Sequence, residues 1–248
     1  MASGCFDLLA GDYDRTWTNS AAGRLQRDAV WRQIARLFRA GDHVLDLGCG
    51  TGEDAEHLIR HGVRVRAMDA SPEMVRLARN RGVNAEVGTI EKIHDLEGAF
   101  DGVFSNFGAL NCVEDLALLR SPLARLVTSG GHLALCLMGR FCLMESLHFL
   151  RQRRFRKASR RWLGRTCIEK LGMHVFYPTA REMERAMAPE FRFVRRTGIG
   201  LAVPPSCISG LSAASLTVRN RIDERVAHWP LLRAMADHEL FIFIRKQH

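Results

Sequence analysis

The chain has 248 residues, of which 47% are hydrophobic, and a formal net charge of +9. This length suits one complete α/β domain with an insertion, or two small domains, and the apolar content is enough for a sizeable core. No stretch approaches the roughly 18 consecutive apolar residues that a membrane-spanning helix needs, which argues against a transmembrane segment.

The cysteines and the first residues indicate the cellular compartment. The seven cysteines are scattered, without a C-x-x-C pair or a Cys/His cluster at zinc spacing, so no metal site is predicted. The first seven residues lack the basic start and the apolar core of a secretory signal. Together these features predict a cytoplasmic protein with reduced thiols.

A helical region comes first, followed by alternating strands and helices. Residues 13–38 are predicted to be helical because Leu25, Val30 and Ile34 recur at spacings that form one apolar stripe. The alternation then predicts a parallel sheet with helices on both faces. The predicted strands are 44–48, 63–68, 83–87, 100–106, 131–138, 191–194 and 240–244, and the predicted helices are 53–61, 72–80, 114–127 and 141–162, with an irregular or helical excursion over 198–233.

Residues 44–52 carry the most informative pattern of the chain. Their sequence, VLDLGCGTG, predicts a buried strand that breaks into a glycine-rich turn. Glycine permits positive φ and leaves no Cβ to block a flat ligand lying against the backbone. Asp46 is expected at the carboxyl end of this strand, where open α/β sheets bind their ligands. A second strand ends at Asp69, whose carboxylate can accept both hydroxyls of a ribose, so the pattern predicts a nucleoside-cofactor site.

Four motifs, in order along the chain, resemble those of class I S-adenosylmethionine-dependent methyltransferases. The spacing D-x-G-x-G-x-G from Asp46 to Gly52 is that of their nucleotide loop and differs from the G-x-G-x-x-G of dinucleotide folds. Residues 69–74 (DASPEM), 100–106 (FDGVFSN) and 129–133 (SGGHL) match their ribose acid, their fourth strand and the turn into their fifth. The resemblance implies an α/β fold with a doubly wound, seven-stranded, mostly parallel Rossmann-like sheet, an antiparallel last strand and a helical lid.

The resemblance places residues 1–248 in a single methyltransferase domain. An N-terminal helical cover is expected over residues 1–40 and a cofactor-binding core over 41–140. A basic helical insertion at 141–175 would form the substrate lid. Residues 176–248 would add the late helices and strands that complete the sheet.

The resemblance implies S-adenosylmethionine as cofactor and S-adenosylhomocysteine as product. Asp46 and the backbone of Gly48, Cys49 and Gly50 are expected to hold the amino-acid end of the cofactor. A plainer interpretation, in which Asp46 only caps the turn, stays open.

The other end of the cofactor and its cover involve further residues. Asp69, with Ala70 beside it, is expected to bind the ribose, and Met74 is expected to lie against the adenine. Tyr13 and Arg27 of the N-terminal cover would face the methionine moiety. Asp69 could instead serve only as the N-cap of the helix at 72–80.

The loops after the third and fourth strands complete the expected cofactor contacts. The family usually has an acid after the third strand, where this chain has Thr89 and Ile90. We expect Ile90 to donate its backbone N–H to the adenine and Thr89 or Glu91 to serve the adenine amine. Asn106 and Phe107 would border the transferable methyl group, although Asn106 could equally be a turn residue.

Methyl transfer requires alignment more than a dedicated catalytic group. The enzyme has to hold nucleophile, methyl carbon and sulfur in line and exclude water, and it needs a base only if the acceptor must lose a proton. The catalytic residue is therefore left unassigned. His148, His174 and Tyr177 are the general-base candidates, and Glu145 has the helical spacing to orient His148.

The acceptor is harder to predict. Residues 105–108 lack the Asn/Asp-Pro-Pro-aromatic run of enzymes that methylate base amino groups, which disfavours base methylation. Eight basic residues and no acid lie between Arg151 and Arg165. This segment could be the solvated face of a helix, could attract an anionic substrate, or could contact nucleic acid or an anionic membrane. Its few interleaved aromatic residues, Phe155 and Trp162, make nucleic acid an unlikely partner.

The sequence thus predicts an enzyme that moves a methyl group from S-adenosylmethionine to a small-molecule acceptor by in-line displacement. An RNA methyltransferase that uses the basic segment 151–165 is one alternative. A binding module that retains the cofactor site without turnover is a second alternative, and a dinucleotide oxidoreductase is a more distant third. The acceptor atom and the oligomeric state are left open.

Overall fold

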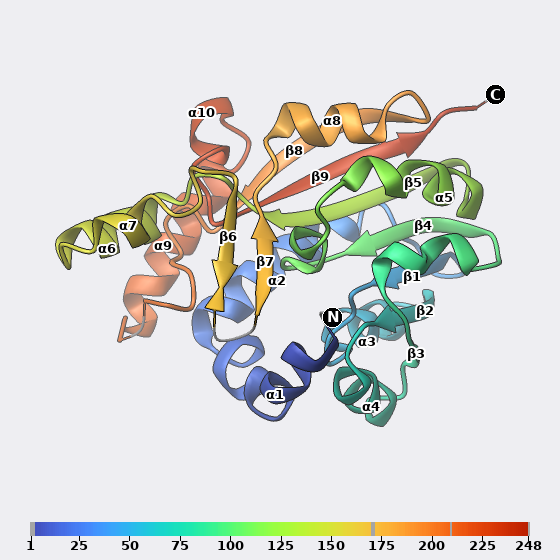
Figure 1. Cartoon of the computed structure of the whole chain (residues 1–248), viewed down its shortest axis with the longest axis horizontal. Coiled ribbons are helices and arrows are strands. Elements are labelled where there is room, and N and C mark those ends of the chain that lie inside the picture. Colours follow the sequence, from blue (N-terminus) through green and yellow to red (C-terminus); the bar gives the residue numbers. More distant parts are fainter. Residues whose placement is uncertain (1–2, 170–171, 209, 248) are drawn as a thin grey trace.

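A computed structural model of the chain describes residues 3–169, 172–208 and 210–247. Figure 1 shows a central twisted sheet with helices on both of its faces. The strands of this sheet are β1 (His43–Leu47), β2 (Arg64–Asp69), β3 (Asn84–Val87), β4 (Phe100–Ser105), β5 (Val127–Met138), β8 (Phe191–Ile199) and β9 (His238–Arg245). The α-helices are α1 (Ser3–Tyr13), α2 (Ala21–Ile34), α3 (Glu53–Arg60), α4 (Pro72–Asn80), α5 (Arg120–Leu126), α6 (Leu143–Arg151), α7 (Phe155–Ala158), α8 (Ala180–Met187), α9 (Ala213–Val226) and α10 (Pro230–Arg233).

The sheet has the topology that the sequence predicts. Its seven strands lie in the order β3-β2-β1-β4-β5-β9-β8. β1 pairs in parallel with both β2 and β4, whereas β9 runs antiparallel to both β5 and β8. The predicted doubly wound, mostly parallel sheet with an antiparallel last strand is therefore confirmed.

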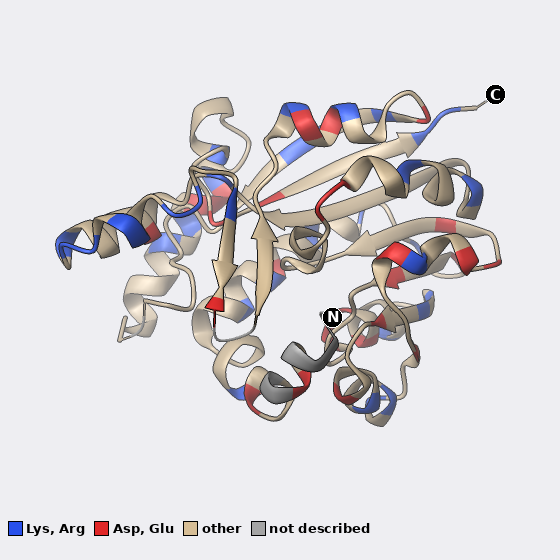
Figure 2. Ribbon diagram, in the orientation of Figure 1, with Lys and Arg blue, Asp and Glu red and all other residues tan. Residues whose placement is uncertain are grey.

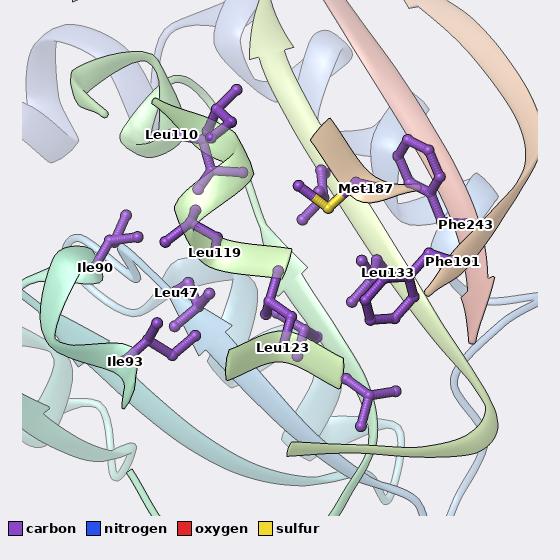
Figure 3. Packing of buried hydrophobic residues seen from close by; sticks show 14 of the residues in the cluster. Leu47, Ile90, Ile93, Leu110, Leu119, Leu123, Leu133, Met187, Phe191 and Phe243 are labelled. Atoms are coloured by element: carbon purple, nitrogen blue, oxygen red, sulfur yellow. The ribbon is translucent and has the colours of Figure 1, made fainter. Parts of the chain in front are cut away.

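Two buried clusters pack on the two faces of the sheet. Leu45 and Leu47 of β1 belong to one cluster and Val44 to the other, as the alternation of side chains along a strand requires. Figure 3 shows the first cluster, in which Leu123 of α5 and Met187 of α8 approach the sheet. Helices α2, α3 and α4 supply the second cluster. Both faces are thus dry, which explains the continuous apolar runs of the inner strands.

The N-terminal helical region is broken. A π-helical segment, Asp14–Thr18, separates α1 from α2, and the side chain of Ser20 caps α2 by accepting a hydrogen bond from the Gly23 N–H at 3.0 Å. A Cβ at Gly23 would lie 2.2 Å from the Trp17 carbonyl oxygen, so this sharp bend requires glycine. The region predicted to be helical over 13–38 therefore consists of a π-helical segment and α2 joined by a bend, and α2 ends at Ile34, because apolar spacing does not register a local cap.

The predicted helix at 114–127 also differs. A 3-10 segment, Leu116–Leu119, leads into the short helix α5, and β5 begins at Val127 instead of 131. The register between β4 and β5 shifts between Phe100 and Gly102, and Gly130 has φ +81° within this irregularity. The Ser-Gly-Gly sequence expected to form the turn before the strand therefore forms a bulge inside it.

The insertion after β5 is only partly helical. The helix predicted over 141–162 divides into α6 and the short α7, and Arg153 between them has φ +56°. Strands β6 (Arg165–Ile168) and β7 (Met173–Phe176) then form a separate two-stranded antiparallel sheet that the sequence analysis did not predict. None of the helices in the described part of the chain is both long and apolar enough to cross a membrane.

Candidate active site

A cavity of about 670 Å³ lies at the carboxyl edge of the sheet, where β1, β2, β3, β4 and β5 end. Most of the cofactor contacts predicted from the sequence line this cavity. They are Tyr13, Gly48, Gly50, Asp69, Ala70, Met74, Thr89, Ile90, Asn106 and Phe107. Arg27, Asp46 and Cys49 do not line it. The topology therefore brings these residues, from five separate parts of the sequence, to one cavity at the carboxyl edge of the sheet, where such sheets bind their ligands.

The glycine loop after β1 forms the floor of the cavity. Gly48, Gly50 and Gly52 have φ values of +75°, +54° and +84°. A Cβ at Gly48 would lie 2.2 Å from the Cβ of Ala109, whereas a Cβ at Gly50 would meet no atom within 4 Å. The first glycine is therefore required by packing and the second keeps space open for a ligand.

Asp69, the last residue of β2, links two loops beside the cavity. Its Oδ2 accepts a hydrogen bond from the Gly50 N–H and its Oδ1 accepts one from the Ser71 N–H, both at 2.9 Å. The N-cap of α4 is Ser71, whose Oγ accepts from the Met74 N–H at 3.1 Å, so Asp69 is not the helix cap. Each carboxylate oxygen can accept a further hydrogen bond. Asp69 can therefore receive two hydroxyl groups from the cavity.

Asp46 lies beneath the loop without a full set of partners. Its side chain is 1% exposed, and its Oδ2 has no hydrogen-bond partner within the described residues. Burial raises the pKa of this carboxyl well above its usual value, and the negative charges of Asp54 and Asp69 raise it further. A buried, unsatisfied carboxylate is costly, so its position favours a cationic ligand group, such as an ammonium, in this part of the site.

Asp54 of α3 is a buried hub that the sequence analysis missed. Its Oδ2 accepts hydrogen bonds from Arg27, with which it forms an ion pair, and from Asn106 Nδ2 at 3.1 Å. Its Oδ1 accepts one from Trp31 Nε1 at 2.7 Å. An acid in the first turn of a helix ordinarily indicates only a favourable helix dipole, which is why this residue drew no attention.

The Asp54 hub explains the position of Arg27. Arg27 was expected to face the cofactor, but its guanidinium pairs with Asp54 and is 5.0 Å from the centre of the Phe107 ring. Phe107 has φ +49° and packs edge-on against Trp17 and His238. Arg27 therefore supports the loop that carries Asn106 and Phe107. It does not line the cavity itself.

Tyr13, the last residue of α1, lines the cavity from the N-terminal cover. Burial raises the pKa of its hydroxyl to about 12, with Arg27 opposing the shift and Asp54 and Asp69 adding to it. At neutral pH the hydroxyl is therefore protonated and can donate a hydrogen bond to a ligand.

The comparisons with known proteins agree with this geometry. A family model described as a methyltransferase domain matches residues 44–131, the segment that contains the glycine loop, Asp69 and the loop after β4. Residues 44–131 are thus similar to a methyltransferase domain. The match stops before the insertion that follows β5.

Curated relatives align over part of their length. A ubiquinone biosynthesis O-methyltransferase of Xanthomonas oryzae pv. oryzae is 36% identical over 112 residues, which are 43% of this chain and 47% of that protein. A demethylmenaquinone methyltransferase of Clavibacter sepedonicus is 34% identical over 145 residues, or 55% of this chain and 57% of that protein. The chain thus spans about half the length of the curated relatives it matches.

Solved structures share the fold over nearly the whole chain. An S-adenosylmethionine-dependent methyltransferase from Mesorhizobium loti has a TM-score of 0.63 at 18% identity and covers 89% of this chain and 98% of its own. A TehB-like S-adenosylmethionine-dependent methyltransferase from Corynebacterium glutamicum has a TM-score of 0.56 at 13% identity, with coverage of 96% and 99%. At such low identity the likeness concerns the fold alone.

The outer wall of the cavity is mostly apolar. Ile168 of β6 and Met173 and Val175 of β7 line it, together with Val113 and Met138. These residues were not predicted from the sequence, because the strands β6 and β7 were not predicted. The sequence signal for these strands is weak. It consists of two short segments of residues that favour β-strands, at 165–168 and 173–176, near a turn.

The three candidate bases do not line the cavity. His148 lies on α6, where its Nε2 is 2.9 Å from Gln152 Nε2, and His174 is exposed on β7. Tyr177 is 3% exposed and lies beneath the guanidinium of Arg161, whose Cζ is 5.6 Å from the ring centre. The expected pairing of Glu145 with His148 is wrong, because Glu145 forms ion pairs with arginines.

Those ion pairs belong to a buried cluster beside the insertion. Arg161 Nη2 lies 2.5 Å from Glu145 Oε2 and 2.9 Å from Asp237 Oδ1, and Arg160 Nε lies 2.7 Å from Glu145 Oε1. Three possible metal ligands also lie in this cluster, the Cys142 thiol and one carboxylate oxygen each of Glu145 and Asp237. These atoms all lie within 4.8 Å of one another, a distance that a metal ion could bridge. Arg161 already supplies the compensating positive charge there, so the cluster is a structural ion-pair network.

The first prediction concerns Asp69. Asp69→Ala should weaken binding of S-adenosylhomocysteine by about 1.5–3 kcal/mol, the range for losing hydrogen bonds to a charged group. Isothermal titration calorimetry measures this loss. Asp101→Ala is the matched control, because Asp101 accepts the His43 N–H at 2.8 Å at the opposite edge of the sheet. Unchanged affinity in folded Asp69→Ala would refute the ribose assignment.

The second prediction concerns Asp46 and pH. Because the folded-state pKa of Asp46 is raised, its contribution to stability is fully present below the unfolded value and is lost as pH rises through the folded value. Asp46→Asn should therefore make the ligand-free protein more stable by about 1–3 kcal/mol at pH 8. Urea unfolding should show this gain shrinking toward pH 4. An equal gain at both pH values would contradict the assigned ionisation.

Proposed function

We propose that this chain is an S-adenosylmethionine-dependent methyltransferase that acts on a small-molecule acceptor. The observation that carries the proposal is the cavity in which Gly50 leaves open space beside the carboxylate of Asp69. The similarity of residues 44–131 to a methyltransferase domain supports the same interpretation. A dinucleotide function is less well supported, because the loop has a different glycine spacing.

The residues of the cavity suit the parts of the proposed cofactor. Asp69 would accept the ribose hydroxyls, and the buried Met74 would lie against the adenine. Asp46 would compensate the ammonium of the amino-acid end, which would relieve its own unsatisfied oxygen. When bound, the cofactor supplies a methyl group already activated on a sulfonium.

Catalysis would then depend on alignment and exclusion of water. Asn106 and Phe107 border the cavity where the methyl group would lie, and their loop is held from behind by Arg27 and Asp54. Rigid support of this kind keeps donor and acceptor in line, the main requirement of a displacement. Tyr13 would remain a neutral hydrogen-bond donor beside them.

The acceptor proposed here is a neutral, largely apolar molecule. Ile168, Met173 and Val175 give the outer cavity an apolar wall, and no arginine of the 151–165 segment lines it within the described residues. Relatives named for ubiquinone biosynthesis and for demethylmenaquinone are consistent with an aromatic, quinone-like acceptor. An anionic acceptor and an RNA acceptor have less support. A cytoplasmic location is part of the proposal, since the scattered cysteines of the sequence favour reduced thiols.

Calorimetric titration tests the cofactor and a turnover assay tests the acceptor. Micromolar binding of S-adenosylhomocysteine and S-adenosylmethionine, without binding of NAD, is the expected result. Release of S-adenosylhomocysteine in the presence of hydroquinones or phenols, and not with RNA, would then support the acceptor class. No adenosyl binding by folded protein would overturn the proposal, whereas binding without turnover on any acceptor would favour the non-catalytic module.

A further inference from the structure

Helices α6 and α7 and the turn that leads to β6 extend from one end of the molecule (Figure 1). We call residues 143–165 the basic projection. Figure 2 shows that lysine and arginine residues are concentrated along its outer part, with few acidic residues among them. It lies outside the segment matched by the family model and outside the lining of the cofactor cavity.

Most of the positive charge of the projection is uncompensated. Of its eight basic residues, Arg160 and Arg161 are paired with Glu145, which leaves six. These six are exposed and form no ion pair with the described residues. They are Arg151, Arg153, Arg154, Arg156, Lys157 and Arg165. The Glu145 pairs hold the end of the projection against α6, so its free cations are displayed on a fixed support.

The basic projection also carries large exposed apolar side chains. Leu163 is 84% exposed, Phe155 64% and Trp162 50%, and Leu147 and Leu150 are also exposed. Apolar side chains beside lysine and arginine are the composition of segments that lie in the headgroup region of a bilayer. The arginines reach the lipid phosphates while the apolar side chains enter the acyl boundary.

We infer that the basic projection docks on the surface of an anionic lipid bilayer. Its charge is complementary to anionic headgroups, which attract basic residues close to the surface. A nucleic acid partner fits less well, because bases stack on aromatic rings and three of the five exposed apolar residues are leucines. A second copy of the same surface would be repelled by its like charges.

Docking would place the cavity beside a source of apolar molecules. The projection continues without a break into β6, and the β6–β7 hairpin supplies Ile168, Met173 and Val175 to the cavity wall. This inference goes beyond the proposed function and does not depend on it, because lipid binding can be measured in the absence of any cofactor or acceptor.

Sedimentation of the full chain with vesicles tests the inference. The protein should bind vesicles that contain phosphatidylglycerol and should dissociate from them as the salt concentration is raised. It should not bind vesicles of pure phosphatidylcholine. Replacing Arg151, Arg153, Arg156 and Arg165 together by glutamine should weaken vesicle binding by roughly a thousandfold, since each basic residue near an anionic surface contributes about 1 kcal/mol. No hydrogen bond or ion pair of these four side chains is present among the described residues, so the variant should fold.

A matched variant distinguishes binding through the basic projection from binding through positive charge elsewhere on the protein. Replacing Arg181, Arg185, Arg192 and Lys246 by glutamine removes the same charge from exposed positions elsewhere and should change vesicle affinity less than threefold. The pair Phe155→Ser and Leu163→Ser should lose at least tenfold, which electrostatic attraction alone would not produce. Both four-residue variants should bind S-adenosylhomocysteine like the unaltered chain.

Three results would overturn the inference. The first is absence of binding to phosphatidylglycerol vesicles, and the second is an equal loss of vesicle affinity in the two four-residue variants. The third is binding to single-stranded RNA that is tighter than binding to vesicles and that is abolished in the projection variant. The last result would assign the surface to nucleic acid. Failure of S-adenosylhomocysteine binding in the unaltered chain would instead count only against the proposed function.

Discussion

Replacing Gly50 by leucine is expected to abolish measurable binding of S-adenosylhomocysteine. The φ of +54° and the absence of any atom within 4 Å of a Cβ mean that the new side chain would project into the cavity. The left-handed backbone would cost roughly 1–2 kcal/mol of stability for a residue with a Cβ. The larger effect is on binding, because the leucine would occupy the volume that the cofactor needs. Calorimetry at high protein concentration measures it.

Gly82→Leu is the matched control for this experiment. Gly82 has φ +81°, a Cβ there would also meet no atom within 4 Å, and the residue does not line the cavity. Both variants therefore carry the same backbone strain, and only one places a side chain in the site. Tight binding by Gly50→Leu, or an equal loss of affinity in Gly82→Leu, would refute the role of the loop.

Asp54→Ala is expected to have the largest effect on stability. The substitution leaves the guanidinium of Arg27, 6% exposed, without its ion-pair partner, and removes the acceptor of Trp31 Nε1 and Asn106 Nδ2. Removing one partner of a buried ion pair costs about 3–5 kcal/mol. Urea unfolding monitored by circular dichroism measures the change in the free energy of unfolding.

Two further variants define the cause of that loss. Asp12→Ala breaks the pair of Asp12 with Arg15, whose side chains are 69% and 74% exposed, and should change stability little. Combining Asp54→Ala with Arg27→Met should restore part of the loss, because no buried charge is then left unpaired. If the double variant is no more stable than Asp54→Ala, the loss of stability is caused by lost packing and not by an unpaired buried charge.

The sequence alone predicted the sheet and about half of the residues that line the cavity. The alternation of apolar runs and helical patterns indicated the parallel sheet, and the D-x-G-x-G-x-G spacing located the loop that now faces Asp69. These features are readable because each is encoded within a few consecutive residues: strand burial by apolar runs, and positive φ by glycine. The order of the strands then follows from the fold that the motifs identify.

Only the tertiary structure decided which charges meet. Arg27 was expected at the cofactor but pairs with Asp54, and Glu145 was expected beside His148 but pairs with Arg160 and Arg161. The β6–β7 hairpin, which supplies the apolar wall, was missed for a related reason: each strand has only four residues. Short strands and long side chains are positioned by packing against distant segments, and local sequence patterns do not encode that packing.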